Sequence, residues 1–224
     1  MKKGLRILQD IALVPPGKNC TIIIRHADRD GALDNLIDNE IGLNDIGRRR
    51  AIEFGKALQQ FNSLQMFTSP VKRCVETCNA IASGFGTDYT LEITELLGMS
   101  SPIMSQPEVA YSLMRSMGLN GFIEAYISGK IDRKIVTPTE EGLRIILSFA
   151  LGKMRDSTAR AFIMVTHDMI ITPALVKFFG YDYRAKGLVP FLDGMVLYES
   201  DYGLRLCYAG KILKVSKDGT VKTQ

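Results

Sequence analysis

The chain has 224 residues, of which 46% are hydrophobic and 23% charged, and this composition is typical of one large globular domain with a substantial core. Its net charge of +4 is mild and its Lys and Arg residues are scattered, so a nucleic acid or other polyanionic partner is not expected. No apolar run approaches the roughly 20 residues needed to span a bilayer, and Arg6, Gln9 and Asp10 interrupt what would be the apolar part of an export signal. We therefore expect a cytoplasmic protein without a membrane anchor.

The four cysteines fit neither a metal site nor a disulfide framework. Cys20, Cys74, Cys78 and Cys207 match no metal-binding spacing, and disulfides are not expected in a chain without an export signal. Cys74 and Cys78 would share one face of a helix. Buried thiols are the favoured interpretation, with reactive thiols as the alternative.

A short apolar run near the start of the chain ends abruptly in charge. Residues 5–14 predict a short helix, and residues 20–25 predict a strand buried on both faces. Four charged or polar side chains follow where this strand ends: Arg25, His26, Asp28 and Arg29. Sheets of α/β proteins bind ligands at this position, and two guanidinium groups beside an imidazole indicate a phosphate pocket. The alternative is a solvated, charged loop.

The next segment predicts a helix that packs on the sheet. A polar connection over residues 30–42 leads to Asn44, which is a good N-cap. The apolar stripe that follows has helical spacing and consists of Ile46, Ala51, Phe54, Ala57, Leu58 and Phe61. Residues 64–68 then predict a second strand.

A third arginine lies where a helix is expected to begin. Ser69 is the predicted N-cap and Pro70 the predicted first residue of a helix over 70–82, which places Arg73 in its first turn. The guanidinium and the positive end of the helix dipole both suit an anion. Residues 89–93 predict a third strand.

The pattern changes over residues 94–136. Several Gly and Pro residues break this segment into short helical pieces, including 108–117 and 122–127. We expect an insertion that lies over the active edge of the sheet as a cap. Side chains that could recognise a leaving group there are Tyr111, Arg115, Phe122 and Tyr126, although helical packing explains them equally well, and Leu113, Met114 and Met117 could be plain core.

Regular structure resumes at a capping box formed by residues 137–140. The helix that follows has a buried face of Leu143, Ile146, Leu147, Ala150, Leu151 and Met154. Residues 161–166 predict a second fully buried strand, which ends at His167 and Asp168, and residues 170–179 predict a helix. Beyond Pro190, short β-rich runs separated by turn residues predict antiparallel hairpins at the sheet edge.

The chain has only two histidines, His26 and His167, and each directly follows an apolar strand. A single histidine after a strand is more often a satisfied polar residue than a catalyst. Two of them, with Arg25 beside one and Arg73 at a helix start, favour a functional site. In a parallel sheet both would emerge at the same edge and could face each other across one phosphate.

Four motifs in order resemble the histidine phosphatase superfamily, the group that includes phosphoglycerate mutases and acid phosphatases. Arg25-His26 with Arg29 resembles the opening signature of that family. Residues 43–47 resemble the helix start that follows it, with Asn44 in place of the usual Thr. Residues 68–73 and 165–167 resemble the segments that supply the next arginine and the second histidine. The resemblance extends over residues 20–170.

The resemblance implies a mechanism that needs neither a metal nor a cofactor. His26 would be the nucleophile that accepts the phosphoryl group. Arg25, Arg73 and His167 would hold the phosphate oxygens, and Arg29 would be a further phosphate ligand. The partner would be a small-molecule phosphate ester.

The general acid has more than one candidate, because the family uses two arrangements. The acid phosphatase branch places an Asp directly after the second histidine, and here that residue is Asp168. The mutase-like branch uses a Glu shortly after the third strand, for which Glu92 and Glu95 are candidates. We favour Asp168 over Glu95; Asp168 could otherwise be a helix N-cap, and the two Glu side chains could be solvated loop carboxylates.

We therefore expect residues 1–224 to form a single three-layer α/β/α domain with a mostly parallel central sheet, a helical cap at about 94–136 and antiparallel edge strands near the C-terminus. The expected activity is metal-independent hydrolysis of a phosphate monoester through phosphohistidine. Alternatives are mutase-type phosphoryl transfer, a protein phosphohistidine phosphatase and a non-catalytic phosphate-binding or phosphoprotein-binding module. The substrate and the oligomeric state are left open.

Overall fold

The computed structural model describes residues 5–30, 39–86, 89–98, 103–156 and 161–222. Its strands are β1 (Cys20–Arg25), β2 (Leu64–Thr68), β3 (Tyr89–Ile93), β4 (Ala161–Thr166), β5 (Gly194–Ser200), β6 (Gly203–Tyr208), β7 (Lys211–Val215) and β8 (Val221–Lys222). Its helices are α1 (Ile7–Ile11), α2 (Asp45–Ala57), α3 (Lys72–Phe85), η2 (Glu95–Leu97), α4 (Pro107–Ile127), α5 (Thr139–Asp156), α6 (Asp168–Ala174), η3 (Leu175–Phe179) and α7 (Tyr183–Lys186). None of the helices described is both long and apolar enough to cross a bilayer.

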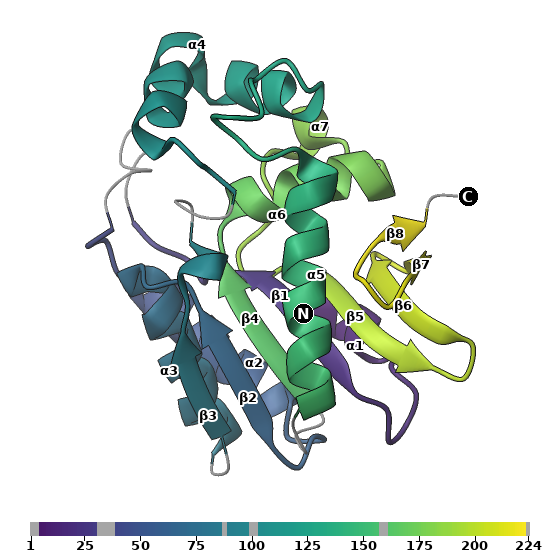
Figure 1. The fold of residues 1–224 in the computed structure, drawn as a ribbon. Coiled ribbons are helices and arrows are strands. Elements are labelled where there is room, and N and C mark those ends of the chain that lie inside the picture. The colour runs from purple at the N-terminus through teal and green to yellow at the C-terminus, as the bar shows by residue number, and fades with distance from the viewer. Residues whose placement is uncertain (1–4, 31–38, 87–88, 99–102, 157–160, 223–224) are drawn as a thin grey trace.

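The strands form one mixed sheet in the order β3-β2-β4-β1-β5-β6-β7-β8 (Figure 1). The first four strands in that order are parallel, and β5 to β8 continue the sheet as antiparallel hairpins. All predicted strands are present, and the predicted α/β class with a parallel core and an antiparallel C-terminal edge is confirmed. Arg25 pairs with Thr166 in the parallel register of β1 and β4. The residues that follow, His26 and His167, therefore leave the sheet side by side.

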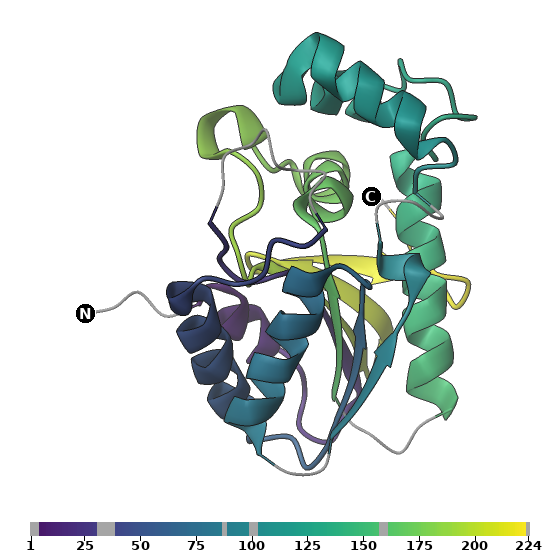
Figure 2. The same cartoon turned by 90° about the vertical axis from the view of Figure 1, so that its left-hand side faces the viewer.

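Helices cover both faces of the sheet (Figure 2). One apolar cluster joins α1, α2 and α3 to one face, and a second joins α4, α5 and α6 to the other. The predicted face of α5 is buried throughout, at Leu143, Ile146, Leu147, Ala150, Leu151 and Met154. These apolar layers hold the sheet edge that carries both histidines.

The stripe predicted for α2 is wrong in part. Asn44 does cap the helix, since its side chain accepts a hydrogen bond from Gly47 N at 2.8 Å. However, Ile46 is 54% exposed and Ala57 is also exposed, whereas Gly47 and Gly55 are buried. Glycine lets a neighbouring backbone approach the helix closely, and a pattern based on apolar side chains does not detect this.

Helix α3 begins later than predicted and extends further. It spans Lys72–Phe85 rather than 70–82, and Val71 occupies the N-cap position. Ser69 is therefore not the N-cap. Its hydroxyl lies 3.0 Å from Nε2 of His167 and accepts a hydrogen bond from Val71 N at 3.3 Å, so this group links the site to the start of the helix.

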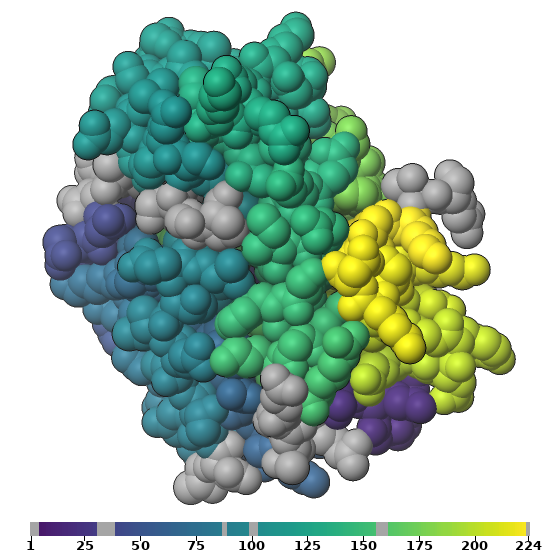
Figure 3. Space-filling model, in the orientation of Figure 1, coloured from purple at the N-terminus to yellow at the C-terminus, as the bar shows by residue number. Residues whose placement is uncertain are grey.

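The segment 94–136 contains η2 and the long helix α4, which lies beyond the carboxyl ends of the parallel strands (Figures 1 and 2). The two predicted helical pieces correspond to the two halves of α4, which meet at a kink where Gly118 has φ of 70°. In the space-filling view α4 forms the top of the molecule (Figure 3).

The predicted helix over 170–179 is also interrupted, because Pro173 has no N–H to donate and the chain widens into the π-helix η3.

Candidate active site

His26 lies in a buried turn directly after β1. Its side chain is 2% exposed, and its backbone N–H donates to Thr166 O at 3.0 Å, which ties the turn to β4. Nδ1 lies 2.8 Å from the carbonyl oxygen of Ala27. A carbonyl can only accept a hydrogen bond, so Nδ1 carries the proton and the lone pair of the neutral ring is on Nε2. This is the tautomer that a nucleophilic imidazole requires.

His167 follows β4 and faces His26. The ring centroids are 5.7 Å apart, so the predicted meeting of the two histidines at one sheet edge is confirmed. His167 Nε2 lies 3.0 Å from Ser69 Oγ, and the thiol of Cys74 lies 3.7 Å from the same nitrogen. Ser69 therefore orients His167, a contact that the sequence patterns did not indicate.

Arg73 joins the two rings from the first turn of α3. Its Nε donates to His26 Nε2 at 3.1 Å, and one terminal nitrogen lies 3.5 Å from His167 Nδ1. A guanidinium can only donate, so Nδ1 of His167 accepts and Nε2 donates to Ser69. In this arrangement Arg73 donates to the Nε2 lone pair of His26.

Arg25 is held from three directions. It forms an ion pair with Asp168 at 2.6 Å and donates to the carbonyl oxygen of Val189 at 2.7 Å. Its guanidinium lies 3.9 Å from the centroid of the Phe191 ring, which also packs against His26 with 5.5 Å between centroids. Sequence reasoning missed Val189 and Phe191, because an apolar residue far along the chain carries no chemical signal.

A cavity of about 20 Å³ lies between these groups. It is lined by His26, Arg29, Arg73, Tyr111, Met114, His167, Asp168 and Met169. A water molecule needs about 10–15 Å³ of such space, so the side chains around the cavity are closely packed. Five of the eight predicted site residues line the cavity. Arg25 does not line it but forms an ion pair with the lining residue Asp168.

The two glutamates predicted as alternative acids do not line the cavity. Glu92 lies within β3 and pairs with Lys153 of α5 at 2.9 Å. Glu95 begins η2, and its side chain is exposed. Gly98 lies close to both Glu95 and Ser69, since a methyl group on it would be 3.5 Å from the Glu95 carboxylate and 3.7 Å from the Ser69 hydroxyl. Glu95 is therefore near the Ser69 side of the site.

Burial and positive charge shape the electrostatics of the site. Burial and then the neighbouring His167 and Arg25 lower the pKa of His26 well below its usual 6.5. Burial and the guanidinium of Arg73 lower the pKa of His167 to about 3. Both rings are therefore neutral near pH 7, while the arginines remain charged. The site presents cationic donors together with an unprotonated imidazole, which suits a phosphate dianion.

The cysteines supply no thiolate to the site, although the Cys74 thiol lies beside His167. All four cysteines are free and buried, in agreement with the favoured interpretation, and burial raises the pKa of the Cys74 thiol. Among the described residues, no group of three or more His, Cys, Asp or Glu side chains is arranged to hold a metal ion.

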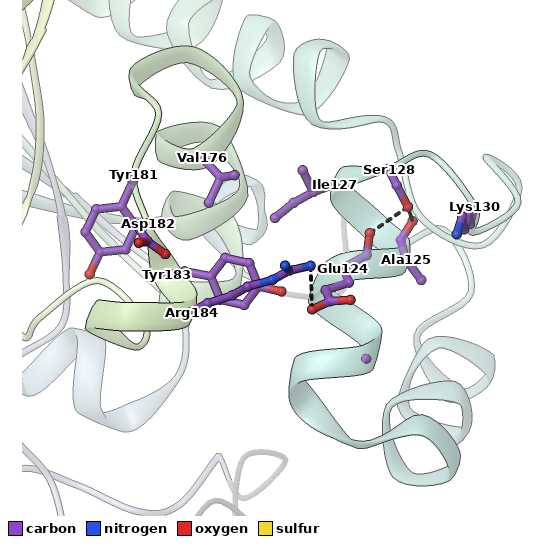
Figure 4. A pocket seen from close by; sticks show the side chains of 11 residues that line it. Glu124, Ala125, Ile127, Ser128, Lys130, Val176, Tyr181, Asp182, Tyr183 and Arg184 are labelled. Carbon is purple, nitrogen blue, oxygen red and sulfur yellow. Dashed lines mark hydrogen bonds and ion pairs between the residues drawn. The ribbon is translucent and has the colours of Figure 1, made fainter.

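A larger cleft of about 550 Å³ lies between α4 and the segment around α7 (Figure 4). Glu124 and Arg184 form an ion pair in it at 2.9 Å, and Tyr181 and Tyr183 contribute to its wall. None of the predicted site residues lines this cleft. The smaller cavity is the candidate active site, because the titratable groups converge there.

Comparison with known proteins finds a family similarity over part of the chain. Residues 21–97 match the family model of the histidine phosphatase superfamily, branch 1. Over these residues the chain is similar to that superfamily. No curated protein sequence is a significant match.

Solved structures of other proteins share the fold of this chain. A mycobacterial hydrolase is 12% identical with a TM-score of 0.56, and the match covers 87% of this chain and 99% of the other. A mycobacterial glucosyl-3-phosphoglycerate phosphatase is 12% identical with a TM-score of 0.54, covering 85% and 96%. Phosphoserine phosphatase from Entamoeba histolytica, in complex with phosphoserine, is 12% identical with a TM-score of 0.51, covering 85% and 95%. At these identities the likeness concerns the fold.

Proposed function

We propose that this chain is a histidine phosphatase that hydrolyses a phosphate monoester of a small molecule through a phosphohistidine on His26, without a metal ion. The observation that carries the proposal is the convergence of His26, His167 and Arg73 around one cavity, with Arg73 Nε 3.1 Å from His26 Nε2. A neutral imidazole supplies the nucleophile, and the arginines neutralise charge on the phosphoryl oxygens. Phosphatase names among the structural neighbours are consistent with hydrolysis.

Substrate binding frees the nucleophile. A phosphate dianion entering the cavity would accept hydrogen bonds from Arg73, Arg25 and Arg29, so Arg73 would turn its donors from His26 to the phosphate. His26 Nε2 then attacks phosphorus in line with the leaving oxygen. The bond between Nε2 and phosphorus forms while the bond between phosphorus and the ester oxygen breaks.

Asp168 is the proposed general acid, because it is 5% exposed and lines the cavity with both histidines. It is paired with Arg25 at 2.6 Å in the substrate-free structure. When phosphate takes the donors of Arg25, the carboxyl group loses this partner and can hold the proton that the leaving alkoxide receives. In the second step the carboxylate takes a proton from water, which attacks phosphorus and releases phosphate from His26.

Leaving-group dependence tests the acid. Asp168→Asn is expected to lower kcat/KM for an alkyl phosphate about 100-fold or more but for 4-nitrophenyl phosphate less than tenfold, because nitrophenolate needs no proton and general acid catalysis contributes about 10²–10⁴-fold. Glu95→Gln and Glu92→Gln are the comparison variants. The selective loss appearing in Glu95→Gln and not in Asp168→Asn would transfer the role to Glu95.

Labelling tests the covalent step. Rapid quench with a ³²P-labelled phosphate ester is expected to trap an acid-labile, base-stable label that is absent in His26→Ala. Activity should persist in excess EDTA. Phosphate binding without label or turnover would instead indicate a binding module.

A mutase would use the same phosphohistidine but return the group to a second hydroxyl. Incubation with 3-phosphoglycerate, with and without a bisphosphate primer, separates the two reactions. Release of inorganic phosphate without 2-phosphoglycerate is the expected result.

We also propose that the segment 94–136 acts as the cap of a single domain, because α4 contributes Tyr111 and Met114 to the cavity.

A further inference from the structure

The part of the cavity that does not face the phosphate is uncharged. His26, Arg29, Arg73, His167 and Asp168 supply all the ionisable side chains of the lining other than the Tyr111 phenol. The remaining lining residues are Tyr111 and Met114 of α4, which we call the roof, and Met169 of α6. The roof comes from the first half of α4, beyond the carboxyl ends of the strands (Figure 2).

The charges of this half-helix lie away from the cavity. Glu108 and Arg115 are exposed, whereas Met114 is only 7% exposed and Tyr111 is half-buried. Tyr111 and Met114 are three residues apart and so share one face of the helix. The surface that α4 turns toward the proposed reaction therefore consists of an aromatic ring and a thioether.

The roof is also uncharged at neutral pH. Burial raises the pKa of Tyr111 above its usual 10, so its hydroxyl remains a neutral phenol. The sulfur atoms of Met114 and Met169 are polarisable and pack well against aromatic rings. Arg25, Arg29 and Arg73 are the cations at the cavity, and the phosphate engages them. A carboxylate on the leaving group would meet no free cation among the lining residues.

From this arrangement we infer that the roof is a leaving-group subsite for an uncharged aromatic or similarly flat apolar alcohol. In an in-line displacement the leaving oxygen points away from the nucleophile. Because His26 lies at the end of β1 and α4 lies beyond the strand ends, we place the leaving alcohol against α4. The inference rests on the proposed phosphatase function and specifies its substrate class. An ester can bind only if the roof moves away from the cavity. The non-helical backbone at Gly118 lies between the roof and the fully buried residues Phe122 and Ile123 of the second half of α4.

Esters of aliphatic alcohols test the subsite without large differences in leaving-group basicity. We expect the wild-type kcat/KM for benzyl phosphate to exceed that for 3-phosphoglycerate at least about 100-fold. Tyr111→Ala should lower kcat/KM for benzyl phosphate about 10- to 100-fold, as expected for the loss of one buried ring contact, and change methyl phosphate less than about threefold. Tyr111→Phe should remain close to wild type. Met114→Lys should raise kcat/KM for 3-phosphoglycerate at least about tenfold.

Val109→Ala is the matched control, because Val109 lies on the same half-helix and is 41% exposed. It should leave all three substrates unchanged. Equal kcat/KM for benzyl phosphate and 3-phosphoglycerate in the wild type would overturn the inference, as would an equal loss on methyl and benzyl phosphate in Tyr111→Ala.

Binding of phosphonates separates this inference from the proposed function. Calorimetric titration is expected to show benzylphosphonate binding at least about tenfold tighter than methylphosphonate, with the difference lost in Tyr111→Ala. If no phosphate ester is hydrolysed but this difference is present, the phosphatase function fails and the subsite stands. If esters are hydrolysed but the two phosphonates bind equally, the subsite fails and the phosphatase function stands.

Discussion

At the scale of single residues, the position of Arg25, a proposed phosphate ligand, depends on a segment more than 160 positions away. Its backbone N–H donates to Asp193 O at 3.0 Å, its side chain donates to Val189 O, and its guanidinium lies over Phe191. Leu192 adopts φ of 56° in this segment and donates to Arg25 O at 3.2 Å. These contacts fix the orientation of Arg25 before a phosphate arrives, which reduces the entropy lost on binding.

Phe191→Leu should weaken phosphate binding while leaving the fold intact. Leucine fills much of the volume but removes the ring face, and a cation–π contact is worth about 0.5–2 kcal/mol. We expect the Kd for inorganic phosphate, measured by calorimetry, to rise about 3- to 30-fold. Phe191→Tyr should restore most of the affinity.

Phe149→Leu provides a matched control, because Phe149 packs on Phe67 with 5.3 Å between centroids and does not line the cavity. It should leave the Kd for phosphate unchanged. If Phe191→Leu bound phosphate as well as the wild type, Phe191 would have no positioning role.

At the scale of elements, the contact between α2 and α3 determines where Arg73 lies. A methyl group at Gly84 would overlap the carbonyl oxygen of Ile52, and one at Gly55 would overlap the carbonyl oxygen of Ile81. The two helices therefore approach each other backbone to backbone. Since α3 carries Arg73 in its first turn, any shift of α3 also shifts the donor that contacts His26.

Gly84→Ala should destabilise the protein by about 1–3 kcal/mol, because the added methyl group has no space and the helices must separate. Urea denaturation measures the change. Gly152→Ala is the matched control, since Gly152 lies in α5 and a methyl group there meets nothing within 4 Å. It should stabilise the protein by about 0.5–1 kcal/mol through helix propensity. Equal effects of the two substitutions would contradict the close contact.

At the scale of the whole molecule, two buried neutral histidines couple folding to pH. The pKa of His26 and that of His167 both lie below the usual 6.5 in the folded protein, mainly because burial disfavours the charged ring. Below pH 6.5 the unfolded chain therefore binds more protons than the folded one. The stability that the neutral rings confer is complete above this pH and is lost as the pH falls toward about 3, where His167 titrates in the folded state.

The free energy of unfolding should accordingly fall below pH 6.5 by up to about 1.4 kcal/mol per pH unit for each histidine. Urea denaturation in phosphate-free buffers between about pH 8 and pH 5 measures the slope. A His26→Gln and His167→Gln double variant should show a shallower slope over the same range. An unchanged slope would place the pH dependence in other groups.

Local patterns predicted much of the fold for an identifiable reason. The apolar runs that became β1, β2 and β4 are buried, as continuous hydrophobic runs in parallel sheets are. The two halves of α4 were also predicted, because Gly118 interrupts the helical pattern. The exposed Ile46 and the late start of α3 were not predicted, since close helix contacts at glycine and the hydrogen bond between Ser69 and His167 depend on distant partners.

The sequence by itself determined the kinds of chemical group available: two histidines after buried strands, three arginines near helix or strand ends, and an aspartate next to the second histidine. The tertiary structure decided their distances and surroundings. The parallel register of β1 and β4 sets the histidines 5.7 Å apart, and long-range packing adds Ser69 and Phe191 to the site and places Glu92 with Lys153. The physical reason is that residue type and spacing act over a few residues, whereas the position of one element relative to another follows from burial across the whole chain.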